Sequence, residues 1–154
     1  MPAVVISRSL RAALTDEPAK DLAAEFRDYK AGALSFGGTF GRDKRFSWPS
    51  EAVSHELWHV HLEDEAAIPT WDRLTANFHL RNYTQDNYTS DTMLVYGRLW
   101  AAYKAPFLLH SILSPNGHAM MEDGSGMRAL AYEYCAEVDA YRREMPGGGW
   151  ILVE

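Results

Sequence analysis

Three of the six histidines of this chain fall within seven residues, at His55, His59 and His61. Histidine titrates near neutral pH and is also a common metal ligand, so such a cluster suits either proton transfer or metal binding. The basic run 42–45 precedes the cluster and could supply positive charge to the same site. The first question is which of the two chemistries the spacing supports.

The segment His55–His59 spells H-E-x-x-H, which on a helix places two histidines on one face to hold zinc, with the glutamate as base. Pro49 and the serine after it can open such a helix. From Trp58 to Glu63, however, apolar and polar residues alternate with period two, which predicts a strand. Within a strand, positions 55 and 59 would lie about 13 Å apart, too far to share one ion. We therefore expect no metal site here, and a zinc-dependent hydrolase stays open as an alternative.

In the strand interpretation, His59 and His61 project from the same face, about 7 Å apart. Glu63 follows on that face. Two histidines and a carboxylate could act as base, acid and orienting group in phosphodiester cleavage. The plain alternative is a polar strand face turned to water.

Five short motifs occur in a set order: FGRD, FSWP, HVHL, TSD followed by MLVY, and an apolar I-L-x-P-x-x-H (residues 40–43, 46–49, 59–62, 89–96 and 112–118). This order resembles the YafO family of bacterial toxins over roughly residues 28–143. The resemblance implies the toxin of a type II toxin–antitoxin pair, a ribosome-dependent mRNA interferase related in fold and action to the RelE group. Because that family needs no histidine at position 55, the resemblance also makes the H-E-x-x-H spelling accidental.

The chemistry that the resemblance implies is cleavage of mRNA without a metal or other cofactor. His59 and His61 are the leading candidates for proton transfer. Arg42 is the candidate for stabilising charge on the phosphate, with Asp43 orienting it or capping its loop. Tyr96 and His118 are added as catalytic candidates only by the family pattern, since alone they are typical of a core tyrosine and a loop histidine.

The net charge of −6 is unusual for a protein that binds RNA freely, because neutralising phosphates supplies most non-specific affinity. A locally basic groove is still possible, and a ribosome would position the substrate. The candidate RNA-binding residues are Arg42, Lys44, Arg45, Trp48, Arg81 and Arg98. The expected partners are a cognate antitoxin, the ribosome and mRNA. A non-catalytic module that binds ribosomes or a protein partner remains a further alternative.

Length and composition predict one folded domain over residues 1–154, because 47% of the residues are hydrophobic. The single cysteine excludes an internal disulfide and fits a reducing compartment. No stretch has transmembrane length, and the apolar run 3–6 is too short for a signal peptide. We therefore expect a cytoplasmic protein without membrane contact.

The expected fold is α+β and RelE-like: a largely antiparallel sheet of four or five strands with helices packed on one face. Gly37, Gly38 and Gly41 predict that FGRD lies on a flexible loop. The segment 68–90 is expected to be irregular. Helices are predicted over 16–30 and 126–143, and strands over 3–8, 57–63, 93–103, 107–114 and 150–153.

Overall fold

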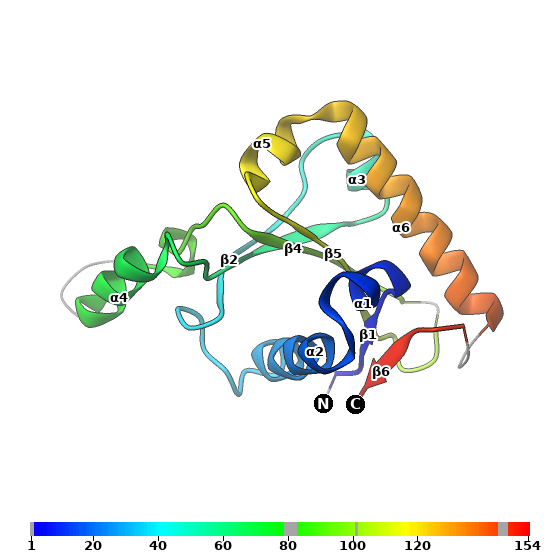
Figure 1. Cartoon of the computed structure of the whole chain (residues 1–154), viewed down its shortest axis with the longest axis horizontal. Helices are drawn as coiled ribbons and strands as arrows, with labels where there is room; N and C mark the ends of the chain where they lie inside the picture. Colours follow the sequence, from blue (N-terminus) through cyan, green and yellow to red (C-terminus); the bar gives the residue numbers. More distant parts are fainter. Residues whose placement is uncertain (1, 79–82, 101, 145–147) are drawn as a thin grey trace.

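A six-stranded mixed sheet forms the centre of the molecule, and the termini lie close together at one of its edges (Figure 1). The computed structural model describes residues 2–78, 83–100, 102–144 and 148–154. The strands are β1 (Val4–Ile6), β2 (Phe40–Arg45), β3 (Trp58–Leu62), β4 (Met93–Arg98), β5 (Phe107–Leu113) and β6 (Ile151–Val153). The helices are α1 (Arg8–Leu14), α2 (Asp16–Lys30), α3 (Ser50–Ser54), α4 (Ile68–Ala76), α5 (Gly117–Glu122) and α6 (Gly124–Glu144), with a short 3-10 turn η2 (Gln85–Asn87).

The strand order is β2-β3-β4-β5-β1-β6, and every neighbouring pair is antiparallel except β1 with β5. The predicted α+β class and largely antiparallel sheet are confirmed. The predicted count of four or five strands is wrong, because the FGRD segment forms the edge strand β2 and not a loop. The glycines just before and within this segment obscure the strand in the sequence. The strand pairs with β3, and the register of that pairing is irregular between Phe40 and Asp43.

Helices cover both faces of the sheet, so the prediction of helices on one face is wrong (Figure 1). On one side, the α2 face, Phe26 of α2 lies in one apolar cluster with strand residues such as Val60 and Leu94. On the other, the α6 face, α3 and α6 pack in a second cluster with residues such as Val95 and Leu108. Adjacent residues such as Leu94 and Val95 are both fully buried because each face has its own cover.

Local sequence explains the helices on the α2 face. Ser7 caps α1, since its hydroxyl accepts a hydrogen bond from the Leu10 amide at 3.0 Å. Helix α2 starts with two acidic residues in its first turn and buries Ala19, Ala23 and Phe26 along one stripe. The predicted helix over 16–30 is confirmed.

Helix α4 extends from one end of the sheet, in a segment that was expected to be irregular (Figure 1). Trp71 and Leu74, three positions apart, bury their side chains in a small separate cluster with Tyr88. A spacing of three between buried residues is typical of a helix, but the polar residues around it obscure this pattern in the sequence. No helix in the described part of the chain is long and apolar enough to span a membrane.

Candidate active site

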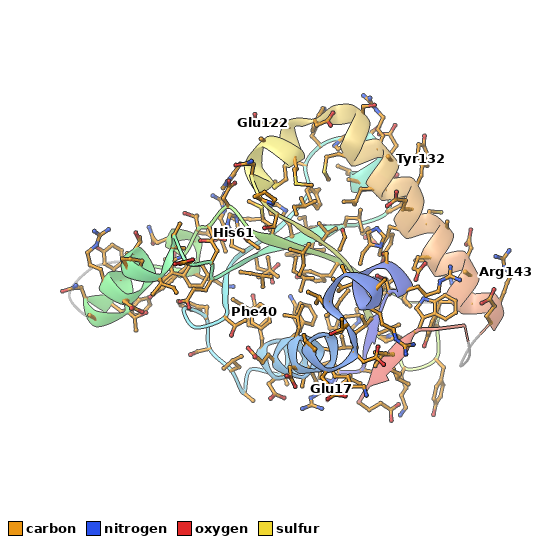
Figure 2. All side chains as sticks on the ribbon, in the orientation of Figure 1. Glu17, Phe40, His61, Glu122, Tyr132 and Arg143 are labelled. Carbon is orange, nitrogen blue, oxygen red and sulfur yellow. The ribbon has the colours of Figure 1, made fainter. Side chains whose placement is uncertain are left out.

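A groove of about 410 Å³ on the α6 face brings together three histidines and three cationic side chains. Strands β2 and β3 form its floor, and α5 forms one wall. Figure 2 shows His61 on the side of the sheet toward α5, whereas Phe40 lies on the side of α2. The residues that line the groove are Arg42, Lys44, Arg45, Ser47, His59, His61, His118 and Met121.

Strand alternation places two of the histidines on the groove floor. His59 and His61 lie opposite Val95 and Met93 in the ladder between β3 and β4, so both side chains point to the α6 face. Their ring centroids are 6.0 Å apart. Lys44 lies opposite His59 in the ladder with β2, which puts it on the same face. The predicted strand and the predicted shared face of the two histidines are therefore confirmed.

His59 is the more enclosed of the two, with 8% of its surface exposed. Its ring lies 4.5 Å from the Phe46 ring, and its Nδ1 has no hydrogen-bond partner among the described residues. Burial, with a smaller contribution from the nearby His61, lowers the pKa of His59 to about 4. The ring is therefore neutral at pH 7, which suits packing and shaping of the groove better than proton donation.

His61 is held in a defined orientation by Ser90. Its Nδ1 lies 2.8 Å from the Ser90 amide nitrogen, and it accepts a hydrogen bond from that amide when the ring proton is on Nε2. The Ser90 carbonyl oxygen lies 2.9 Å from the same Nδ1 and can accept from it once the ring is protonated. Burial lowers the pKa of His61 below its usual value, with the backbone contact to Ser90 acting in the opposite direction. The contacts at Ser90 thus accommodate both protonation states of this ring.

His118 reaches the groove from α5 and pairs with Asp91. One carboxylate oxygen of Asp91, Oδ1, lies 2.9 Å from His118 Nδ1 and accepts from the His118 amide at 2.8 Å. These hydrogen bonds lower the pKa of the Asp91 carboxyl. The carboxylate selects the tautomer with the proton on Nδ1, which leaves Nε2 free as an acceptor. The His118 ring centroid is 5.5 Å from that of His61.

A glycine makes this pairing possible. Gly117 donates its amide to the Asp91 carbonyl at 2.9 Å, and a side chain at this position would meet that oxygen at 2.8 Å and the Met93 sulfur at 2.5 Å. Only glycine allows the backbone before His118 to lie this close to Asp91. Asp91 ends the TSD motif, but nothing in the sequence marks it as a site residue.

The three cationic side chains of the groove differ in whether they form ion pairs. Arg42 is exposed and forms no ion pair within the ranges that the structure describes. Lys44 pairs with Asp86 at 3.0 Å, and Arg45 pairs with Glu56 at 3.1 Å. Arg42 is therefore the cation best placed to meet a phosphate.

Asp43 and Tyr96 lie on the α2 face, away from the histidines. The Asp43 carboxylate accepts from Tyr96 at 2.7 Å, and from Tyr29 and Lys30 at 2.8 Å each. The predicted contact of Asp43 with Arg42 is not made, because consecutive strand residues point to opposite faces. Burial raises the pKa of the Tyr96 hydroxyl, so it stays a neutral donor to Asp43. The structure thus separates these two predicted catalytic residues from the groove.

The remaining predicted RNA-binding residues are dispersed. Trp48 is about half exposed beside Gly124, where α6 begins. Arg98 lies on the α2 face, with its guanidinium 4.5 Å from the ring centroids of both Trp100 and Phe107. Arg81 falls outside the described residues.

The H-E-x-x-H spelling does not form a helical zinc motif. Helix α3 ends at Ser54, Glu56 has a φ of 53°, and β3 begins at Trp58. His55 lines a different hollow, beside Tyr134 and Cys135. Among the residues that the structure describes, no group of three or more histidine, cysteine or carboxylate side chains is arranged to hold a metal ion.

Comparison with known families places this geometry in context. The model of one family, described as toxin YafO of type II toxin–antitoxin systems, matches residues 27–137. The chain belongs to the YafO toxin family. The match contains the groove residues Arg42, His59, His61 and His118, and also Asp91, the partner of His118. No curated protein and no solved structure matches the chain, so the expected relation of this YafO-family toxin to the RelE fold stays a prediction.

Proposed function

We propose that this toxin is an endoribonuclease that cuts mRNA on the ribosome and thereby inhibits translation and growth. The observation that carries the proposal is the Asp91–His118 pair beside His61 and Arg42 in one open groove, where Arg42 forms no ion pair with any described residue. A base, a second proton-transfer group and a cation are the parts that cleavage by the ribose 2′-hydroxyl requires.

His118 is the base of this proposal. Its free Nε2 removes the proton from a ribose 2′-hydroxyl, and the oxygen attacks the adjacent phosphorus. Asp91 fixes the tautomer and stabilises the imidazolium that forms. Because His118 is exposed at the rim, a ribose can approach it without displacing the protein core.

His61 is the acid. The bond from phosphorus to the 5′-oxygen breaks as His61 donates a proton from Nε2 to that oxygen, while the Ser90 carbonyl accepts from Nδ1 of the protonated ring. Arg42 stabilises the charge that develops on the phosphate oxygens. The products are a 2′,3′-cyclic phosphate and a 5′-hydroxyl. His59 packs beneath the site and sets the position of His61.

Dependence on the ribosome is supported by the charge of the whole chain. A net charge of −6 gives little attraction for free RNA. A ribosome that aligns the message at the groove would supply positioning, which can contribute about 7–11 kcal/mol of barrier reduction.

The family defines the partner class as an antitoxin, because its members are toxins of type II pairs. We propose that the cognate antitoxin neutralises the toxin by covering the groove around Arg42 and His118, or by making the complex too bulky for the ribosome. An antitoxin segment that is disordered alone and folds on binding would suit this task.

Expression of the chain in bacteria tests the function. Growth should stop, and primer extension should find cuts in a reporter mRNA but not in the same transcript with a mutated start codon. The new ends should be 5′-hydroxyls. Equal cutting of both transcripts would contradict ribosome dependence, and an intact message during growth arrest would contradict the nuclease assignment.

A further inference from the structure

A second hollow, of about 230 Å³, lies on the α2 face of the same strands. Its walls include the aromatic side chains Trp58, Tyr96, Trp100 and Phe107. Pockets for drug-sized ligands usually run to about 300–1,000 Å³, so this hollow suits a smaller, flat group. We call it the tryptophan hollow.

Neighbouring side chains hold the aromatic rings of the hollow in position. The Trp58 ring stacks on Tyr96 with centroids 6.3 Å apart and an interplanar angle of 26°. The Arg98 guanidinium lies 4.5 Å from the ring centroids of both Trp100 and Phe107, and its Nε donates to the Ala105 carbonyl at 3.0 Å. Trp100 nevertheless leaves 66% of its surface exposed. A large aromatic surface that is braced by a cation and open to solvent can stack on a planar ligand.

The floor of the hollow offers a charged donor. Lys30 Nζ donates to Asp43 at 2.8 Å and to Tyr96 at 2.6 Å. An ammonium group has three N–H donors, and the described residues account for two of them. The third can serve a carbonyl or phosphate oxygen of a ligand in the hollow.

The tryptophan hollow adjoins the histidine groove at the edge strand β2, because Arg45 lines both. Charge is distributed unevenly over this chain, which has 15 basic and 21 acidic residues. The two linings together contain five of the basic residues and only one acidic residue, Glu56. Aromatic surfaces interleaved with cations are typical of sites for single-stranded nucleic acid.

We infer that the tryptophan hollow binds a nucleobase of single-stranded RNA that flanks the cleaved bond. The base stacks on Trp100 or Trp58, and the backbone passes the β2 edge beside Arg45, whose exposed ion pair with Glu56 gives way to a phosphate. Lys30 donates to a base carbonyl or a phosphate oxygen. This inference rests on the proposed RNA substrate and adds a binding subsite to it.

Titration of the full-length chain with a 2′-O-methylated hexaribonucleotide tests the inference, because this probe lacks the attacking hydroxyl and stays intact. The indole N–H signals of Trp58 and Trp100 should move in NMR spectra, whereas those of the buried Trp71 and Trp150 should not. The variants Trp58→Phe and Trp100→Ala identify the signals.

Trp100→Ala should weaken binding of the probe about tenfold, as expected for loss of one base stack. Trp100→Phe should restore most of the affinity. Tyr103→Ala is the matched control, since Tyr103 is 76% exposed and does not line the hollow. Both variants change exposed rings and should leave the fold intact.

Two results would overturn the inference. One is a titration that moves no Trp58 or Trp100 signal, whether or not the histidine groove responds. The other is equal probe affinity for the wild type and Trp100→Ala; loss of binding to the cognate antitoxin in that same variant would then assign the hollow to a protein partner. The proposed nuclease function is judged separately, by the cuts found in translated mRNA.

Discussion

At the scale of single residues, the three histidines of the groove have different environments. His118 is exposed and oriented by a carboxylate, His61 is oriented by a backbone amide, and His59 is buried with a pKa of about 4. These environments give the three rings different tasks, since only the first two have a defined ring nitrogen directed by a partner.

Asp91 is expected to act through His118. The variant Asp91→Asn should lower the cleavage rate, though less than loss of His118, because an amide can still bind the ring but cannot stabilise the imidazolium. Single-turnover cleavage assays should therefore rank the wild type above Asp91→Asn and Asp91→Asn above His118→Ala. A wild-type rate in folded Asp91→Asn would contradict this role of Asp91.

Arg42 is expected to stabilise charge in the transition state. Arg42→Ala should lower kcat for mRNA cleavage by about 10²–10³-fold, as for loss of one donor to a developing oxyanion. Lys44→Ala is the matched control, because Lys44 lines the same groove but is engaged by Asp86. Equal losses in single-turnover assays of the two variants would indicate general electrostatic attraction and contradict the specific role of Arg42.

Sequence patterns predict which face of the sheet carries the histidine groove, but not all of the residues at the site. Period-two alternation was sufficient to put His59 and His61 on one face. The glycines around FGRD predict a loop in which Asp43 could reach Arg42, but in the strand that forms, Asp43 points to the opposite face and bonds Tyr96. Asp91 was missed because its partner His118 is distant in sequence, and only the fold brings the two within 2.9 Å.

At the scale of elements, close packing of α6 on β4 depends on a small residue. A side chain at Gly97 would meet the Tyr134 hydroxyl at 2.1 Å. Gly97→Ala should therefore lower the free energy of unfolding by about 1–3 kcal/mol, because the helix or the tyrosine must shift. Chemical denaturation measures this effect.

Gly38→Ala is the control for that substitution, since no atom lies within 4 Å of a side chain at Gly38. Its unfolding midpoint should stay close to that of the wild type. If Gly97→Ala were equally harmless, the close contact between α6 and β4 would not be a feature of the folded protein.

Two features of the fold, strand β2 and the cover on both faces of the sheet, are not fully predicted from the sequence, and each has a physical reason. Strand β2 follows a glycine-rich segment, and its irregular pairing with β3 weakens the alternation that marks a strand. The cover on both faces was signalled by runs such as Val4–Ile6, in which consecutive residues are all apolar. Such a run predicts a short strand that needs cover on both faces, but it does not say which helix supplies each cover.

At the scale of the whole molecule, the stability of the fold should depend on buried histidines. Burial lowers the pKa of both His59 and His110 to about 4, below the 6.5 of an exposed histidine. The unfolded chain therefore binds more protons between pH 6.5 and 4, and stability falls as the pH falls through that range. Each histidine contributes up to about 1.4 kcal/mol per pH unit.

His110→Phe should reduce this pH dependence. His110 packs edge-on against Tyr134, with centroids 5.7 Å apart, and its two ring nitrogens have no partner among the described residues. A phenyl ring keeps the packing and removes the titrating group. Denaturant unfolding at pH 5.0 and 6.5 should show a smaller difference for the variant, and identical differences would contradict the assignment of a neutral His110.

The central claim is that His118 in this groove cuts mRNA during translation. The most direct measurement is cleavage of a defined mRNA by purified protein in a reconstituted translation reaction, compared among the wild type, His118→Ala and the control His55→Ala. We predict that His118→Ala cuts about 10²–10⁴-fold more slowly, that His55→Ala cuts like the wild type, and that omission of ribosomes abolishes cutting. Cutting by folded His118→Ala at the wild-type rate, or equal cutting of naked RNA, would contradict the claim.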